Sequence, residues 1–216
     1  MIANDVVTGI ITIIIAYLLG SIPSAYIASR IVTGNDIRQM GGGNVGARNT
    51  FFEVGKAAGA AVAIFDIGKG AAAVAIALWL LDVHPNFALA AGLAVVAGHI
   101  WSIFLRFTGG NGLATTLGAL SVLLPKELLI VIGIILLLII FTRNPVLSTN
   151  ISLLSAPIST WLIEKSWQQV IFCVALIVML ALHFLPTARA ALADAGSKEN
   201  FLAQLLRRNK TREKET

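Results

Sequence analysis

Apolar residues fill most of the chain in long runs that charge, glycine or proline interrupts. A helix needs about 20 apolar residues to cross about 30 Å of hydrocarbon, so each long run predicts a membrane span. The shortest run would reach only about 18 Å as a helix, which leaves six spans plus a re-entrant segment as an alternative to seven. The seven predicted helices are residues 6–28, 57–81, 87–105, 113–124, 128–141, 146–163 and 168–185.

Composition leads to the same fold class. Of the 216 residues, 57% are hydrophobic and only 12% are charged, whereas about a quarter of a soluble domain is charged. The surplus apolar surface must face lipid, so we expect an all-α, polytopic bundle of membrane helices. We expect one membrane-embedded domain at 1–200 and a basic tail at 201–216. Cys173 is the single cysteine, and the sequence has no Cys/His ligand cluster, so no metal site is expected.

Lysine and arginine fall mostly on one side of the predicted spans. With seven spans, the other side holds only Lys126 and Lys165, and Lys69 lies inside the second span. Cytoplasmic loops retain positive charge, so this asymmetry predicts an outside N-terminus and a cytoplasmic C-terminus. The basic tail would be attracted to anionic lipids, which makes membrane lipids expected partners.

The loop after the first span is rich in glycine and arginine. Successive glycines let backbone N–H groups form a concavity for an anion, and a guanidinium can bind a phosphate with two hydrogen bonds. The alternative is a flexible turn whose arginines only follow the charge asymmetry of the loops. The candidate phosphate-binding residues here are Arg38, Gly41, Gly42, Gly43, Asn44, Gly46, Arg48 and Asn49.

A second glycine-rich loop follows the third span, on the same predicted side of the membrane. Gly-Gly-x-Gly at a helix start presents unpaired N–H groups and the positive end of the helix to an anion. Two such loops on one side indicate a phosphorylated substrate, or two. The alternative is an ordinary turn at a helix start. The candidates are Gly109, Gly110, Asn111, Gly112 and Thr115.

Four ionisable residues lie inside predicted spans, where each charge is costly. Asp66 and Lys69 are three residues apart, so they share a helix face and can form a structural ion pair. Contact of Lys69 with a polar head group is the functional alternative. His99 and His183 could each accept a proton from a hydroxyl group, although a lone histidine in an apolar helix more often hydrogen-bonds a neighbouring oxygen.

With these residues in view, the chain resembles the bacterial acyl-phosphate:glycerol-3-phosphate 1-acyltransferases. Near the C-terminus, His183 and Arg189 fit the family pattern, and Gly196 and Glu199 fit after a short insertion. The earlier matching motifs are Gly20-Ser21-Ile22-Pro23-Ser24, Asp36-Ile37-Arg38, Gly41-x-Gly43-Asn44-x-Gly46-Ala47-x-Asn49, Asp66-x-x-Lys69-Gly70, and Gly98-His99 followed by Phe104, Phe107 and the second glycine loop.

The resemblance implies a bacterial plasma-membrane enzyme of phospholipid synthesis. Its substrates would be acyl phosphate and glycerol 3-phosphate, and its products lysophosphatidate and phosphate, without a coenzyme or metal. Arg48, His99 and His183 are then the candidate catalytic residues. The soluble enzyme that makes acyl phosphate would be a functional partner, and no nucleic-acid partner is expected. An acyl phosphate already has a good leaving group, so positioning and electrostatic stabilisation could suffice without a protein nucleophile.

Five positions depart from the family pattern. Gly42 replaces a serine, Arg48 a threonine, Phe52 an arginine, Asn111 a lysine and Pro186 an asparagine. One interpretation of these changes is an active enzyme with rearranged phosphate contacts or a different acceptor. Two alternatives stay open beside it. One is a weak or inactive paralogue that binds acyl phosphate or a lysolipid. The other is a small transporter built around the intramembrane pair of Asp66 and Lys69.

Overall fold

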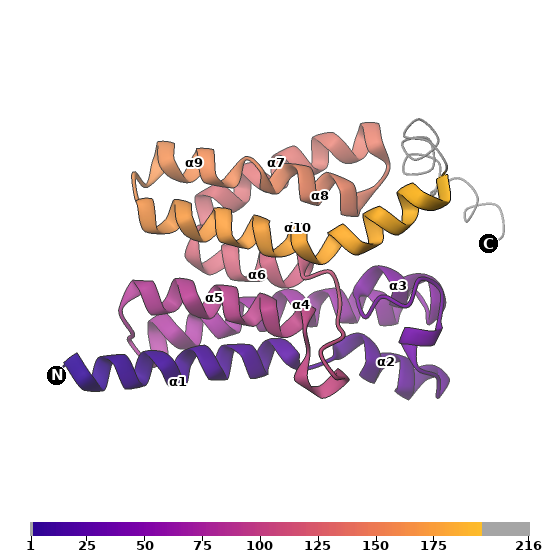
Figure 1. The fold of residues 1–216 in the computed structure, drawn as a ribbon, viewed down its shortest axis with the longest axis horizontal. Coiled ribbons are helices and arrows are strands. Elements are labelled where there is room, and N and C mark those ends of the chain that lie inside the picture. The colour runs from indigo at the N-terminus through magenta and orange to yellow at the C-terminus, as the bar shows by residue number, and fades with distance from the viewer. Residues whose placement is uncertain (1, 196–216) are drawn as a thin grey trace. The chain divides into compact units, whose positions relative to one another are not determined.

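The computed structural model describes the backbone of residues 2–195 and the side chains of residues 5–185. These residues form helices and connecting turns without any strand, which confirms the all-α class (Figure 1). The chain divides into two compact units, Met1–Pro125 and Lys126–Thr216. The single domain expected at 1–200 stays a prediction. The expected tail at 201–216, with Gly196 and Glu199, lies outside the described residues, as do the side chains of Pro186 and Arg189.

The first unit contains six α-helices, and its two most extensive helix pairs are α1 with α5 and α4 with α6 (Figure 1). The connections include two short 3₁₀ turns, and α4 runs on into one π-helical turn at Ile76–Leu80. The helices are α1 (Ile2–Ser21), α2 (Ser24–Thr33), α3 (Ala47–Glu53), α4 (Lys56–Ala75), α5 (Pro85–Ile100) and α6 (Leu113–Leu123).

Glycines without room for a side chain bring these helix pairs together. A Cβ atom on Gly98 would overlap the Tyr17 carbonyl across the α1–α5 contact, and one on Gly118 would overlap the Ile67 carbonyl across the α4–α6 contact. Small residues at such positions let membrane helices approach closely, and this packing replaces the hydrophobic effect that is missing in lipid.

Gly118→Ala is expected to destabilise the α4–α6 contact by about 1–3 kcal/mol, because a backbone carbonyl cannot move aside as a side chain can. Gly68→Ala on α4 is the matched control, since no atom lies within 4 Å of its added Cβ. The apparent Tm in detergent should fall for Gly118→Ala and stay level or rise for Gly68→Ala. Equal Tm values for the two variants would contradict the packing argument.

The first predicted span, 6–28, is interrupted in the structure at Ile22 and Pro23. Proline has no N–H to continue the α1 hydrogen-bond ladder, so α1 ends at Ser21 and α2 begins at Ser24. Side chains from α4 and from the segment after α5 satisfy the carbonyls left at the break. The Ser102 hydroxyl donates to the Ser21 carbonyl at 2.5 Å, and the Lys69 ammonium donates to the Ile22 carbonyl at 3.0 Å.

The second unit contains α7 (Pro125–Thr142), α8 (Pro145–Leu153), α9 (Ala156–Ile163) and α10 (Trp167–Ala195). The predicted span 146–163 is also interrupted, at Leu154 and Ser155, just before the first-turn proline of α9. Serine hydroxyls around the interruption donate to backbone carbonyls three or four residues earlier, as in Ser155 to Ser152 at 2.7 Å. These bonds satisfy carbonyls that lipid cannot.

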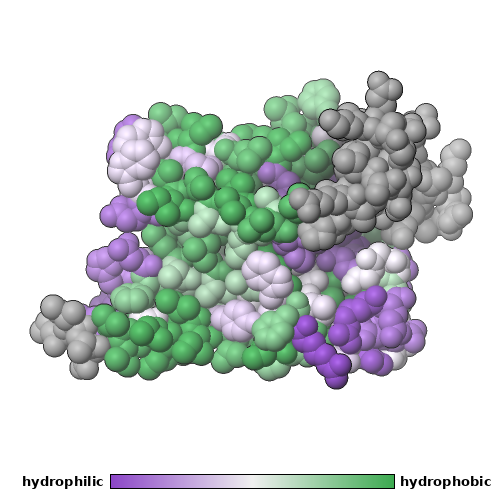
Figure 2. Space-filling view, viewed as in Figure 1, coloured by the Kyte–Doolittle hydropathy of each residue, from purple (hydrophilic) through white to green (hydrophobic). Residues whose placement is uncertain are grey.

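Six helical segments of the described chain are long and apolar enough to cross a membrane, and the 11-residue α6 is not. Seven spans are therefore not confirmed, and the alternative of six spans with one partial segment fits the structure. Apolar side chains face outward along α1, including Ile10 and Ile14, while polar side chains gather over α2 and α3 (Figure 2). The protein is a multi-pass membrane protein, and its predicted orientation stays a prediction.

Candidate functional site

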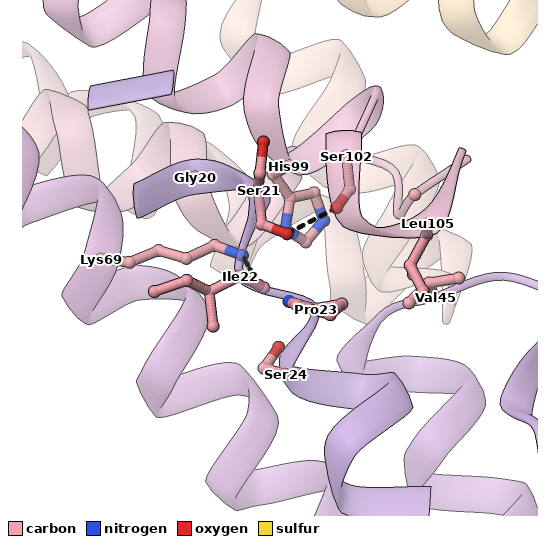
Figure 3. A pocket seen from close by; sticks show the side chains of 11 residues that line it. Gly20, Ser21, Ile22, Pro23, Ser24, Val45, Lys69, His99, Ser102 and Leu105 are labelled. Carbon is pink, nitrogen blue, oxygen red and sulfur yellow. Dashed lines mark hydrogen bonds between the residues drawn. The ribbon is translucent and has the colours of Figure 1, made fainter. Parts of the chain in front are cut away.

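A small hollow in the first unit lies at the break between α1 and α2 (Figure 3). Lys69 of α4 and His99 of α5 reach it from two helices, and Val45 and Gly109 reach it from the two glycine-rich loops. The hollow therefore brings together most segments that sequence reasoning singled out in this unit. Its lining is Gly20, Ser21, Ile22, Pro23, Ser24, Val45, Lys69, His99, Ser102, Leu105 and Gly109.

Asp66 is the buried charge beside the hollow. Its Oδ1 accepts hydrogen bonds from the Lys69 ammonium at 2.9 Å and the Ser24 hydroxyl at 2.7 Å. The predicted pair of Asp66 and Lys69 thus lies within contact distance, with both side chains almost fully buried. Mutual neutralisation and the added hydroxyl make these charges tolerable at membrane depth.

His99 is held between Asp66 and the second glycine loop. Its Nδ1 lies 3.5 Å from Asp66 Oδ1, and its carbonyl accepts a hydrogen bond from the Gly110 N–H at 3.1 Å. Nε2 faces the Gly110 backbone, where a Cβ atom would overlap it. A carboxylate on the Nδ1 side favours the tautomer that carries its proton on Nδ1, which leaves Nε2 as the proton acceptor.

The two glycine loops meet beside His99. A Cβ on Gly110 would overlap both His99 Nε2 and the Val45 carbonyl oxygen. Gly110, next to Asn111 in the second loop, therefore contacts Val45, next to Asn44 in the first loop. The predicted convergence of the loops is therefore present in the structure. Neither Asn44 nor Asn111 lines the hollow, and both are half-buried.

Asn49 organises the first loop from within. Its side-chain carbonyl accepts from the Gly42 N–H at 3.2 Å, and its amide donates to the Met40 carbonyl at 3.0 Å. Gly41 and Gly43 adopt left-handed backbone angles with φ of 55° and 70°, which glycine accommodates without strain. Asn49 was predicted to bind phosphate, but its amide hydrogen-bonds the loop backbone. Gly46 is the N-cap residue that precedes α3 and, like the other glycines of this loop, it does not line the hollow.

The two predicted arginine ligands lie outside the lining of the hollow. Arg38 Nη2 lies 2.6 Å from Asp36 Oδ2, and this side-chain hydrogen bond lowers the pKa of Asp36 and raises that of Arg38. Arg48 on α3 holds its guanidinium carbon 5.3 Å from the ring centre of Phe52, one turn further along the helix. Two of the positions that depart from the family pattern therefore contact each other.

The remaining predicted residues divide between the two units. Gly112 takes φ 78° where it precedes α6, and the Thr115 hydroxyl is fully buried without a hydrogen-bond partner among the described residues. His183 lies on α10 in the second unit, edge-on to Phe184 with ring centres 6.0 Å apart. Its role in the site stays a prediction.

Sequence reasoning missed the serines of the hollow, which are Ser21, Ser24 and Ser102. The available signal was the Gly-Ser-Ile-Pro-Ser segment, because a proline inside an apolar run predicts a helix break with free backbone groups. Ser102 carried no comparable signal, since its partner Ser21 is 81 residues away in sequence.

Comparison with known proteins agrees with these features. The family model described as glycerol-3-phosphate acyltransferase matches residues 10–192. The chain is 41% identical to glycerol-3-phosphate acyltransferase 1 of Dehalococcoides mccartyi, over 88% of this chain and 94% of that protein. It is 39% identical to the glycerol-3-phosphate acyltransferase of Endomicrobium trichonymphae, over 79% of this chain and 85% of that protein.

Two solved structures share the fold of this chain. The crystal structure of PlsY (YgiH), an integral membrane glycerol 3-phosphate acyltransferase, in its glycerol 3-phosphate form superposes with a TM-score of 0.76 at 27% identity. The match covers 86% of this chain and 92% of that one. The lysophosphatidic acid form gives a TM-score of 0.74 over the same shares of the chains. The sequence and structural matches together show that this chain belongs to the glycerol-3-phosphate acyltransferase family.

Proposed function

We propose that the protein transfers a fatty acyl group from acyl phosphate to the 1-hydroxyl of glycerol 3-phosphate in phospholipid synthesis. The products are lysophosphatidate and inorganic phosphate. The observation that carries the proposal is the hollow where Lys69 and His99 converge with both glycine loops, in a chain of this family. The named relatives and the PlsY structures support the same activity.

In the proposed reaction the 1-hydroxyl oxygen attacks the carbonyl carbon of the acyl phosphate. The new ester C–O bond forms, the bond from the carbonyl carbon to the phosphate oxygen breaks, and phosphate leaves. The hydroxyl proton passes to His99 Nε2, and Asp66, 3.5 Å from Nδ1, stabilises the imidazolium that results. The leaving group needs no further activation, so no covalent intermediate on the protein is required.

Lys69 and the glycine loops suit the phosphate end of either substrate. The Lys69 ammonium has three N–H donors, and two of them are accounted for by Asp66 and Ile22. Lys69 lines the hollow, so the third donor is available to a phosphoryl oxygen. Gly109 lines the hollow, where its backbone N–H can stabilise developing negative charge. The Gly110 N–H donates instead to the His99 carbonyl.

The expected setting follows from the charge asymmetry of the loops. We place the site on the cytoplasmic side of the bacterial plasma membrane, with the N-terminus outside. The water-soluble acceptor then reaches the site from the cytoplasm, while the acyl chain of the donor stays in lipid. A soluble enzyme that makes acyl phosphate would supply the donor, and we expect neither a coenzyme nor a metal to take part.

A second candidate function is a paralogue that binds acyl phosphate or a lysolipid with little turnover. It is favoured by the absence of Arg38 and Arg48 from the lining of the hollow, because each charge-assisted contact to a phosphate contributes about 1.5–3 kcal/mol.

The test uses the purified full chain with acyl phosphate and glycerol 3-phosphate. We expect phosphate release with equal formation of lysophosphatidate, measured by colorimetry and mass spectrometry. 2-Hydroxypropyl phosphate is the matched control, because it lacks only the 1-hydroxyl and should support no lysophosphatidate formation. Ligand protection against heat without acyl transfer would overturn the enzyme assignment and favour the binding paralogue.

A further inference from the structure

The segment that follows α5, residues 101–107, presents large apolar side chains outward. Phe104 is 60% exposed and Phe107 is 61% exposed. Trp101 and Ile103 are exposed beside them, and Arg106 adds an exposed cation. We call this segment the aromatic loop. So many apolar side chains on one short loop would be costly in water, so the surface calls for an apolar partner.

The inner side of the aromatic loop belongs to the candidate site. Ser102 and Leu105 line the hollow (Figure 3). Leu105 also packs into a buried apolar cluster with Val45 of the first glycine loop. One face of the aromatic loop is therefore a wall of the hollow, while the other face is open and apolar.

Helix length places the aromatic loop at an end of a membrane span. The 16 residues of α5 reach about 24 Å, short of the hydrocarbon thickness of about 30 Å. The apolar stretch that is long enough to cross runs on from Pro85 to Leu105. In Figure 1, α1 and α5 run horizontally, and the segment after α5 projects toward the lower edge of the first unit. The loop thus lies on a lateral face of these helices, the kind of face that lipid covers.

Backbone groups of the aromatic loop are hydrogen-bonded within the protein. The Ser102 carbonyl accepts from the Leu105 N–H at 3.1 Å and from the Phe107 N–H at 2.8 Å. The Trp101 carbonyl accepts from the Tyr17 hydroxyl at 2.8 Å. A non-helical segment in contact with lipid needs such internal partners, whereas a loop in water obtains them from solvent. The bonding pattern therefore supports lipid contact independently of side-chain exposure.

Two residues of the aromatic loop hold left-handed backbone angles, Arg106 with φ 55° and Phe107 with φ 60°. Glycine would adopt these angles without strain, and it is the usual residue where a helical turn closes in this way. The chain has a cation and an aromatic ring there instead, and both are exposed. Such side chains suit the membrane interface, where aromatic rings lie at the boundary of the acyl chains and long cations reach the phosphates.

We propose that the aromatic loop is a bilayer-contact element that holds the mouth of the hollow in the headgroup layer of a phospholipid membrane. Phe104 and Phe107 lie in the apolar boundary, and Arg106 contacts lipid phosphates. The functional consequence rests on the proposed function. A long-chain acyl phosphate then reaches Lys69 and His99 while its chain stays in lipid.

The first test measures whether lipid or water surrounds the aromatic loop. The full chain with Phe104→Cys carries a nitroxide spin label in vesicles of phosphatidylcholine and phosphatidylglycerol. Cys173, the single native cysteine, is buried and should stay unlabelled. Paramagnetic resonance compares collisions with oxygen, which concentrates in lipid, and with a water-soluble nickel chelate. Labels at Ile14→Cys on α1 and at Gln39→Cys on an exposed polar turn are the lipid and water references.

The label at position 104 should show a ratio of oxygen to nickel collisions close to that at position 14 and well above that at position 39. A ratio like that at position 39 would mean that the loop lies in water. Few collisions with either reagent would mean that protein covers the loop. Each of these two results would overturn the inference.

The second test compares donors of different chain length. The double variant Phe104→Ser with Phe107→Ser should raise the KM for palmitoyl phosphate about tenfold, because both side chains lose their transfer free energy to lipid. The KM for butyryl phosphate, which is soluble in water, should stay unchanged. Phe141→Ser is the matched control, since Phe141 is an exposed residue of the second unit and does not line the hollow. It should leave both KM values unchanged.

An equal rise of KM for both donors would indicate damage to the hollow itself, and unchanged values for both would indicate that the loop has no part in donor access. Either result would overturn the functional consequence. If the wild type transfers no acyl group from either donor, the proposed function fails, and the spin-label comparison still decides whether the aromatic loop contacts the bilayer.

Discussion

His99→Asn is expected to lower kcat for acyl transfer by about 10²–10⁴-fold, the usual contribution of a general base. In the wild type, His99 Nδ1 lies 3.5 Å from Asp66 Oδ1. Asparagine can place its amide N–H near the position of Nδ1 and so keep this contact. It has no group at the position of Nε2. The substitution therefore removes the proton acceptor while leaving the buried carboxylate partnered.

The measurement is single-turnover formation of lysophosphatidate, together with protection of the protein by glycerol 3-phosphate against heat. Turnover should fall and protection should persist, because the base acts in the transition state more than in the ground state. His84→Asn is the matched control. His84 caps the N-terminus of α5, where it accepts from the Asn86 N–H, and asparagine is a good residue at such a position. Equal activities of the two variants would exclude His99 as the base.

Hydropathy predicts the helices of this protein well because lipid imposes a simple rule on length and composition. It does not predict the breaks at Pro23 and Leu154, since both lie inside apolar runs. Such breaks are tolerated only where side chains satisfy the freed backbone groups. Ser102 and Lys69 do so for α1, and they are distant in sequence from the carbonyls that they bind.

The site was predictable where local chemistry decides and less so where distant partners compete. Glycines in loops expected on one membrane side do meet beside His99. The arginines were harder to place, because a guanidinium binds whichever acceptor or ring lies near it. Arg38 binds Asp36 two residues away, and Arg48 stacks on Phe52. Ser21 had only its motif to mark it, since its environment comes from α5 and the segment after it.

Asp66→Ala is expected to destabilise the protein by about 3–5 kcal/mol, the usual cost of leaving one charge of a buried pair without its partner. The Lys69 ammonium would keep only the Ile22 carbonyl, and Ser24 would lose its acceptor. The double variant Asp66→Leu with Lys69→Met removes both charges and should recover part of the lost stability, because it relieves the unpaired charge but also removes the donor to the Ile22 carbonyl. It should stay inactive, because the site then lacks its cation and the carboxylate beside His99.

Measuring apparent Tm and turnover on the same preparations separates the effect of these substitutions on stability from their effect on acyl transfer. The control is the pair of Lys126 and Glu164 in the second unit, which has the same 2.9 Å separation but exposed side chains. Lys126→Ala should leave the apparent Tm unchanged, because solvent screens exposed pairs. If Asp66→Ala also leaves Tm unchanged, the buried pair does not stabilise the fold. If the double variant is no more stable than Asp66→Ala, the unpaired Lys69 charge is not the main cause of the loss.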